Sequence, residues 1–192
     1  MSVLIAVVYY SGSGHTEKLA QHVMRGLKKV DGVTAKLMLA EKIAKDPTQL
    51  NEMDAIIFGT PTYMGSVAAP FKAMMDASSK VWMHQNWKDK IAAGFTNSHS
   101  MSGDKLNTLM QLVVFAMQHG MIWVGQSELN QSPETEAGHP EKINRLGSFV
   151  GAMAQSDNRD PIETPPFGDL ETAAQLGQRV GRITMQMKKG EK

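Results

Sequence analysis

The sequence contains no cysteine among its 192 residues. This absence excludes disulfide bonds, zinc–thiolate sites and a cysteine nucleophile, and it agrees with an expected cytoplasmic location. Neither sign of charge is in large excess. The chain has 20 lysines and arginines and 19 acidic residues, which gives a formal net charge of +1. A nucleic-acid-binding chain usually has a strong basic excess, so we expect no nucleic-acid partner.

Long apolar runs are absent as well. No stretch approaches the ~20 apolar residues that cross a bilayer, so we expect no membrane span. The first apolar run, Val3–Tyr10, lacks the basic flank and cleavage site of a signal peptide. Hydrophobic residues make up 42% and charged residues 20% of the chain. This composition, without repeats or linkers, predicts a single globular domain over residues 1–192.

Apolar runs alternate along the chain with amphipathic helical patterns. The predicted strands are Val3–Tyr10, Thr34–Leu39, Ala55–Gly59, Ile91–Phe95 and Met121–Val124. The predicted helices are Thr16–Val30, Pro70–Ala77, Asp104–His119 and Asp169–Lys189. The alternation predicts an α/β fold, a doubly wound five-stranded parallel sheet in the flavodoxin-like order 2-1-3-4-5. The proline-rich segment 126–168 lacks periodicity, and we expect it to be a long inserted loop.

The most informative stretch is Ser11-Gly12-Ser13-Gly14-His15-Thr16, which follows the first predicted strand and opens a helix. Hydroxyl groups, backbone amides and the positive end of the helix dipole meet there, in a loop that holds no lysine or arginine. Such a loop binds a phosphate through uncharged donors. It predicts a site for the phosphomonoester of a mononucleotide cofactor.

Other phosphate-binding loops fit this stretch less well. A Walker A loop requires a lysine that is missing, and a dinucleotide fingerprint requires a third glycine where Glu17 stands. A phosphatase loop built on cysteine is excluded. A phosphoacceptor receiver domain requires an aspartate at the end of the third strand, where Gly59 and Thr60 stand.

Two further loops are expected at the same edge of the sheet. Residues 59–66 and 96–103 follow the third and fourth predicted strands, and both are small, polar and poor in charge. Ligands of doubly wound sheets bind beyond the carboxyl ends of the strands. A planar ring with carbonyl and imide edges is therefore expected between these loops, with Tyr63 or Met64 against its face.

Four sequence motifs carry a resemblance to a known family. They are Tyr9-Tyr10-Ser11-x-x-Gly14-His15, the run Ala55-Ile56-Ile57-Phe58-Gly59-Thr60-Pro61-Thr62, the spacing Val81-Trp82…Lys90, and His119-Gly120-Met121. At these residues the chain resembles the flavodoxin superfamily and, within it, the WrbA-type NAD(P)H:quinone oxidoreductases. The likeness covers about the first 125 residues and the final helix.

The resemblance implies a bound FMN. Its phosphate would lie on Ser11, Gly12, Ser13, Gly14, His15 and Thr16. Its isoalloxazine ring would lie against Pro61, Thr62, Tyr63, Met64 and Gly65. Its pyrimidine edge and ribityl chain would meet Thr96, Asn97, Ser98, His99, Ser100, Met101 and Ser102. Trp82 would form part of the open face where nicotinamide and quinone stack in turn.

The function implied is transfer of two electrons from NAD(P)H, through FMN, to a quinone or a similar acceptor. No metal and no catalytic side chain are expected, since the cofactor carries the chemistry. The resemblance also implies a homo-oligomer, a dimer or a tetramer. Two alternatives stay open, a flavodoxin-type electron carrier that needs a separate reductase and a non-catalytic FMN-binding subunit. His119 is interpreted as a helix C-terminal residue that favours the dipole.

Overall fold

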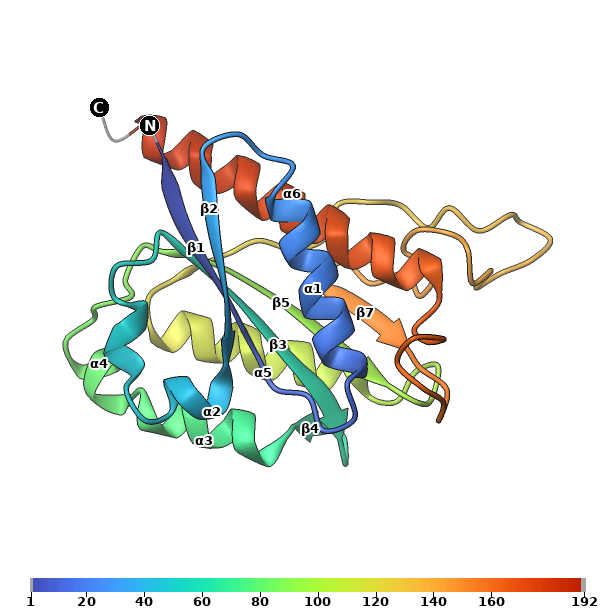
Figure 1. Cartoon of the computed structure of the whole chain (residues 1–192), viewed down its shortest axis with the longest axis horizontal. Helices are drawn as coiled ribbons and strands as arrows, with labels where there is room; N and C mark the ends of the chain where they lie inside the picture. Colours follow the sequence, from blue (N-terminus) through green and yellow to red (C-terminus); the bar gives the residue numbers. More distant parts are fainter. Residues whose placement is uncertain (1, 191–192) are drawn as a thin grey trace.

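The computed structural model describes residues 2–190, which build a twisted sheet with helices on both faces (Figure 1). Five strand positions follow the order β2-β1-β3-β5-β6, all parallel. The strands are β1 (Val3–Tyr9), β2 (Val33–Leu39), β3 (Ala55–Tyr63), β4 (Ser66–Val67), β5 (Ile91–Ser98), β6 (Ile122–Trp123) and β7 (Ala152–Gln155). Along the five central positions this is the predicted order 2-1-3-4-5, so the predicted fold is confirmed.

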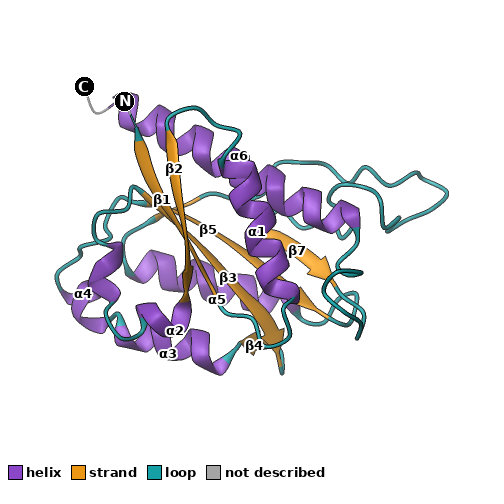
Figure 2. Cartoon of the chain, in the orientation of Figure 1, coloured by secondary structure: helices purple, strands orange, loops and turns teal. Residues whose placement is uncertain are grey.

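Helices cover both faces of the sheet (Figure 2). They are α1 (His15–Leu27), α2 (Ala40–Ile43), α3 (Ala69–Ala77), α4 (Ser79–Met83), α5 (Lys105–Gln118) and α6 (Phe167–Gly190), with a short 3-10 helix at Pro47–Leu50. One buried cluster joins the sheet to α1 and α6, and a second joins its other face to α2, α3, α4 and α5. The sheet is therefore the middle layer of three.

The first strand shows why these apolar runs become central strands. Val3, Ile5 and Val7 belong to the cluster under α1 and α6, whereas Ala6 and Val8 belong to the cluster on the other face. Successive side chains of a strand point to opposite faces, so a strand between two helical layers is apolar at every position. A continuous apolar run, and not an alternating one, is the expected pattern here.

The fifth strand position is shared between two short strands. β6 pairs with the beginning of β5, at Ile91 and Ala92, and β7 pairs with its end, from Phe95 to Ser98. Residues 124–151, the insertion segment, leave the sheet between them and extend sideways (Figure 1). The prediction that 126–168 is all loop is thus wrong, because Ala152–Gln155 is a strand of only four residues whose partners lie far back in the chain.

Two strands, β3 and β5, extend further than the sequence predicts. β3 continues past Gly59 to Tyr63 and turns back into β4 through Met64 and Gly65, whose φ angles are +49° and +75°. The polar side chains at this end are buried because they bond to one another. The Thr62 Oγ1 atom lies 2.8 Å from Thr96 Oγ1 and 2.8 Å from Thr108 Oγ1. Hydroxyl pairing lets β-branched threonines continue a buried strand.

Candidate functional site

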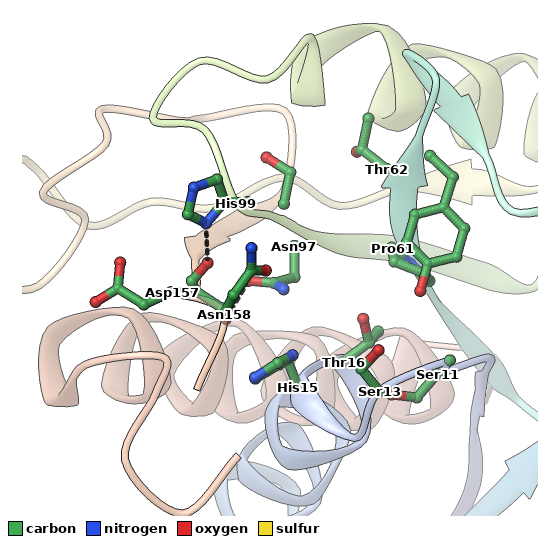
Figure 3. A pocket seen from close by; sticks show the side chains of 14 residues that line it. Ser11, Ser13, His15, Thr16, Pro61, Thr62, Asn97, His99, Asp157 and Asn158 are labelled. Atoms are coloured by element: carbon green, nitrogen blue, oxygen red, sulfur yellow. Dashed lines mark hydrogen bonds between the residues drawn. The ribbon is translucent and has the colours of Figure 1, made fainter. Parts of the chain in front are cut away.

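A polar pocket of about 220 Å³ lies beyond the carboxyl ends of β1, β3 and β5 (Figure 3). Four segments line it. The first contributes Ser11, Gly12, Ser13, His15 and Thr16, the second Pro61, Thr62 and Tyr63, the third Asn97, Ser98 and His99, and the fourth Ser156, Asp157 and Asn158. The structure therefore brings the three predicted loops together around one cavity, at the edge where doubly wound sheets bind ligands.

The loop between β1 and α1 has the backbone of an anion site. Gly14 stands at the N-cap of α1 with φ +86°, a conformation that favours glycine. The first amides of the helix have no partner within it, so they face the ligand side. The Ser11 Oγ atom is buried and has no hydrogen-bond partner within residues 2–190. A buried hydroxyl of this kind requires a further partner.

Tyr63 lies directly over this loop. A Cβ atom placed on Gly12 would come within 2.5 Å of the Tyr63 hydroxyl oxygen, so the absence of a side chain at position 12 makes room for the phenol. Tyr63 is half exposed and, with Pro61, lines one side of the pocket. An aromatic face is thus placed next to the anion loop.

The opposite side is built by β5 and the segment that follows β7. Ser156 Oγ donates a hydrogen bond of 2.8 Å to Asn97 Oδ1, and His99 Nδ1 lies 3.2 Å from the carbonyl oxygen of Ser156. The sequence reasoning missed Ser156, Asp157 and Asn158. Their signal was the end of β7, because every parallel strand delivers its following residues to the same edge of the sheet.

The same segment closes the outer side of the anion loop. His15 Nε2 lies 2.9 Å from the carbonyl oxygen of Arg159, and Lys18 Nζ donates 2.7 Å to the carbonyl oxygen of Ile162. Pro161 packs on Gly14, where an added Cβ would lie 2.7 Å from the proline Cγ. Glycine at position 14 is thus required twice, by its φ angle and by this contact.

Several predicted site residues lie outside the lining of this pocket. Gly14 turns toward Pro161, Met64 is fully exposed at the β3–β4 turn beside Gly65, and Thr96 is buried under the strand end. The others are Ser100, Met101 and Ser102, in the loop that follows β5. Trp82 lies on α4, outside the lining of the pocket, with 43% of its surface exposed. Its predicted place on the open face stays a prediction.

The pocket carries little charge. Its ionisable side chains are His15, Tyr63, His99 and Asp157, so no lysine or arginine contributes to the lining. Behind the loop, Tyr9 donates a hydrogen bond of 3.1 Å to Glu17, and burial together with this carboxylate raises the pKa of Tyr9 to about 12. Tyr9 therefore stays neutral and serves as a donor that orients the first turn of α1.

Residues 2–190 hold neither a candidate metal site nor a candidate membrane span. No cluster of three or more histidine, aspartate or glutamate side chains there has an arrangement that could hold a metal ion. No helix in this part of the chain is both long and apolar enough to cross a membrane.

Comparison with known proteins gives consistent relatives. The family described as NADPH-dependent FMN reductase matches residues 1–136. Flavodoxin FldP of Pseudomonas aeruginosa is 40% identical over 187 residues, which cover 94% of this chain and 96% of that protein. Quinone-oxidoreductase QR2 of Triphysaria versicolor is 30% identical and covers 98% of both chains.

Solved structures agree with these relatives. The crystal structure of the flavodoxin, WrbA-like protein from Agrobacterium tumefaciens is 40% identical and matches 96% of this chain and 99% of its own, with a TM-score of 0.72. A flavodoxin from the domain Archaea has 18% identity, covers 95% of this chain and 99% of its own, and has a TM-score of 0.64, which shows the shared fold alone.

Proposed function

The chain belongs to the NADPH-dependent FMN reductase family, and we propose that it binds FMN in the pocket described above and passes two electrons from NAD(P)H to a quinone or a similar small acceptor. Relatives named NAD(P)H dehydrogenase (quinone) and quinone-oxidoreductase support this activity.

The observation that carries the proposal is the unpartnered Ser11 hydroxyl. It is buried in the loop that begins α1, beside the free amides of the first helical turn. A phosphomonoester supplies oxygens for such donors, and the helix dipole favours its charge. Ser13 and Thr16 add two more hydroxyls to the same lining. The donor set therefore fits the phosphate of FMN.

The remaining walls fit the ring and the sugar chain. Pro61 and Tyr63 offer a flat surface next to the phosphate loop, and Asn97 and Ser98 offer polar groups across the cavity. FMN supplies the redox chemistry when it is bound, as a carrier of a hydride equivalent. The protein's part is to fix the ring, to satisfy its polar edge and to leave a face open for the electron donor.

A second candidate function is that of an electron carrier that needs a separate reductase. The name of the 40%-identical relative, flavodoxin FldP, favours it. The near-neutral net charge of +1 favours the enzyme, because carriers of this class often steer docking with a strongly acidic surface.

The two functions predict opposite results in one experiment. Under the proposed function, FMN-loaded protein mixed with NADPH without oxygen loses its yellow absorbance within seconds, and an added quinone restores it. Rapid-mixing absorbance spectroscopy follows both phases. Protein that stays yellow with both NADPH and NADH, yet bleaches once a flavodoxin reductase is added, is a carrier. Folded protein that takes up no FMN contradicts both functions.

Replacing Ser11 by alanine tests the phosphate site. Removing one hydrogen bond to a charged group costs about 1.5–3 kcal/mol, so the dissociation constant for FMN is expected to rise at least about tenfold. Riboflavin, which has no phosphate, serves as the control ligand, and its binding should not change. Fluorescence titration measures both ligands. An equal loss for both would place the phosphate away from Ser11.

We also propose that the chain forms a homo-oligomer. An apolar groove of about 420 Å³ lies between α3 and α5, and the side chains of Met110 and Val114 are 42% and 56% exposed there. Exposed apolar surface of this kind is typical of interfaces. The exposed Trp82 lies on α4, which follows α3 directly.

A further inference from the structure

Lys105 is a fully buried cation next to the pocket. It is the first residue of α5, and its side chain has 0% exposure. The ammonium group donates three hydrogen bonds, of 2.9 Å to Ser98 Oγ, 2.8 Å to the carbonyl oxygen of Ser100 and 2.9 Å to that of Met101. An ammonium has three donors, so every one of them is used within this single loop.

The loop that Lys105 holds is tightly constrained. Ser98 Oγ also donates 3.0 Å to the carbonyl oxygen of Ser100. Gly103 and Asp104 both adopt positive φ angles, +54° and +53°, and a Cβ on Gly103 would overlap the Ser98 side chain. A buried charge is retained only where hydrogen bonds offset its desolvation. Lys105 is therefore the centre around which residues 98–104 fold.

The same loop forms one wall of the pocket. Ser98 and His99 line the cavity, whereas Lys105 lies behind them and does not reach it. From the other side, Gln155 Nε2 donates 3.0 Å to the carbonyl oxygen of His99. Hydrogen bonds from the Lys105 ammonium and from the Gln155 amide therefore hold this wall from two sides, and neither of these groups lines the pocket.

We propose that Lys105 is a positioning residue of the pocket: its ammonium holds residues 98–101 in the conformation that places Ser98 and His99 against the ligand, and thereby sets the affinity for FMN. The inference rests on the proposed function, because it concerns the same pocket. It adds a residue that no contact with the cavity reveals.

Titration of Lys105 makes the inference measurable. Burial lowers its pKa to about 8, Asp169 of α6 opposes this shift, and Arg145 of the insertion segment adds to it. His99 is the ionisable side chain of the loop itself, and Asp104 adjoins Lys105 in the chain. A neutral amine has two donors for three acceptors, so above pH 8 one bond is lost. The affinity for FMN should fall with the ammonium.

The chain offers a matched control at the opposite end of β5. Lys90 Nζ donates 2.7 Å to the carbonyl oxygen of Asn51 and 2.6 Å to that of Met53, and burial lowers its pKa as well. It precedes β5, whereas the pocket lies at the other end of that strand. Replacing Lys90 therefore removes a comparable tether without touching the wall of the pocket.

The experiment compares FMN dissociation constants at pH 7 and pH 9 for the wild type, Lys105→Met, Lys105→Arg and Lys90→Met. With a pKa of about 8, the wild-type constant should rise about tenfold between the two pH values. Lys105→Met should bind at least about tenfold more weakly at pH 7, equally at both pH values. Lys105→Arg keeps its charge and should lose the pH dependence. Lys90→Met should follow the wild type.

Each outcome decides a separate point. A wild type that binds no FMN overturns the proposed function and this inference with it. A wild type that binds FMN, beside a Lys105→Met protein of equal affinity, overturns the inference alone. If circular dichroism shows that Lys105→Met does not fold, the pH slope of Lys105→Arg decides: a slope equal to that of the wild type overturns the inference, and its disappearance supports it.

Discussion

Replacing Gly26 by alanine is expected to lower the free energy of unfolding by about 3 kcal/mol, at the upper end of the usual cost of overpacking. Gly26 lies where α1 crosses α6, and an added Cβ would overlap the carbonyl oxygen of Ala174. Gly177 of α6 meets the carbonyl oxygen of Val23 in the same way. The obstacle is backbone, so no side-chain rotation relieves it and the helices must move apart.

Thermal or urea unfolding measures this effect, and Gly190→Ala is the control. Gly190 also lies in α6, but nothing is within 4 Å of the Cβ that would be added there. Helix propensity alone favours alanine over glycine, by about 1 kcal/mol in a helix interior, so it cannot explain a loss of stability in Gly26→Ala. A destabilised Gly26→Ala protein beside an unchanged Gly190→Ala protein therefore reports contact between helices. Equal stability of the two variants would show that the helices cross less closely.

Sequence reasoning found the parts of the fold that follow local rules. The run Val3–Tyr10 is apolar at every position because both faces of β1 are buried, and this pattern is legible without any structure. The loop from Ser11 to Thr16 is equally legible, since its glycines and hydroxyls stand between a strand and a helix. Close helix crossings such as that of Gly26 and Gly177 depend on pairing of distant segments, which the pattern does not show.

The pocket residues that the sequence does not predict all follow β7, a strand that it does not predict either. β7 has four residues, and its pairing partner, β5, lies more than fifty residues earlier in the chain. Strands this short carry a weak periodicity signal. Once β7 was missed, Ser156, Asp157 and Asn158 could not be placed at the edge of the sheet. Thr96 is predicted at the site as well, and its hydroxyl lies 2.8 Å from that of Thr62 inside the strand layer, so its contact with a ligand stays a prediction.

A residue that supports the pocket without lining it, as we propose for Lys105, is harder still to predict from the sequence. Lys105 stands in the first turn of an amphipathic helix, where a lysine is normally exposed. Its burial depends on the left-handed turn at Gly103 and Asp104, which points the side chain back under the preceding loop. Trp82 shows the opposite placement, because this predicted substrate residue is exposed on α4 and is not part of the pocket lining, so its role stays a prediction.

His119 lies at the C-cap of α5, as the sequence predicts, but its side chain is buried in the core and does not face solvent at the helix end. Its side chain is 1% exposed, stacks on Trp87 at a centroid distance of 4.3 Å and meets the edge of Phe115 at 4.8 Å. Ser78 Oγ donates to the carbonyl oxygen of Met75, so the His119 Nε2 atom, 3.0 Å away, is the donor to that hydroxyl. The Nδ1 atom has no partner among the described residues.

Acid is therefore expected to destabilise the protein through His119. Burial lowers its pKa from 6.5 to about 4 in the folded state, so the folded chain resists a proton that the unfolded chain accepts. Above pH 6.5 both states are neutral and nothing is lost. As the pH falls from 6.5 toward 4, stability is lost progressively, about 2 kcal/mol by pH 5 and up to about 3 kcal/mol below pH 4.

The variant His119→Phe isolates this contribution. Phenylalanine can keep the stack on Trp87 and does not titrate, so the stability lost between pH 7.5 and pH 5 should be about 2 kcal/mol smaller than in the wild type. Urea unfolding at the two pH values gives the difference, and replacement of the exposed His84 by glutamine is the control. His22, whose pKa burial also lowers, contributes equally to wild type and variant. An unchanged acid loss in His119→Phe would mean that water reaches the imidazole and that this part of the core opens below pH 6.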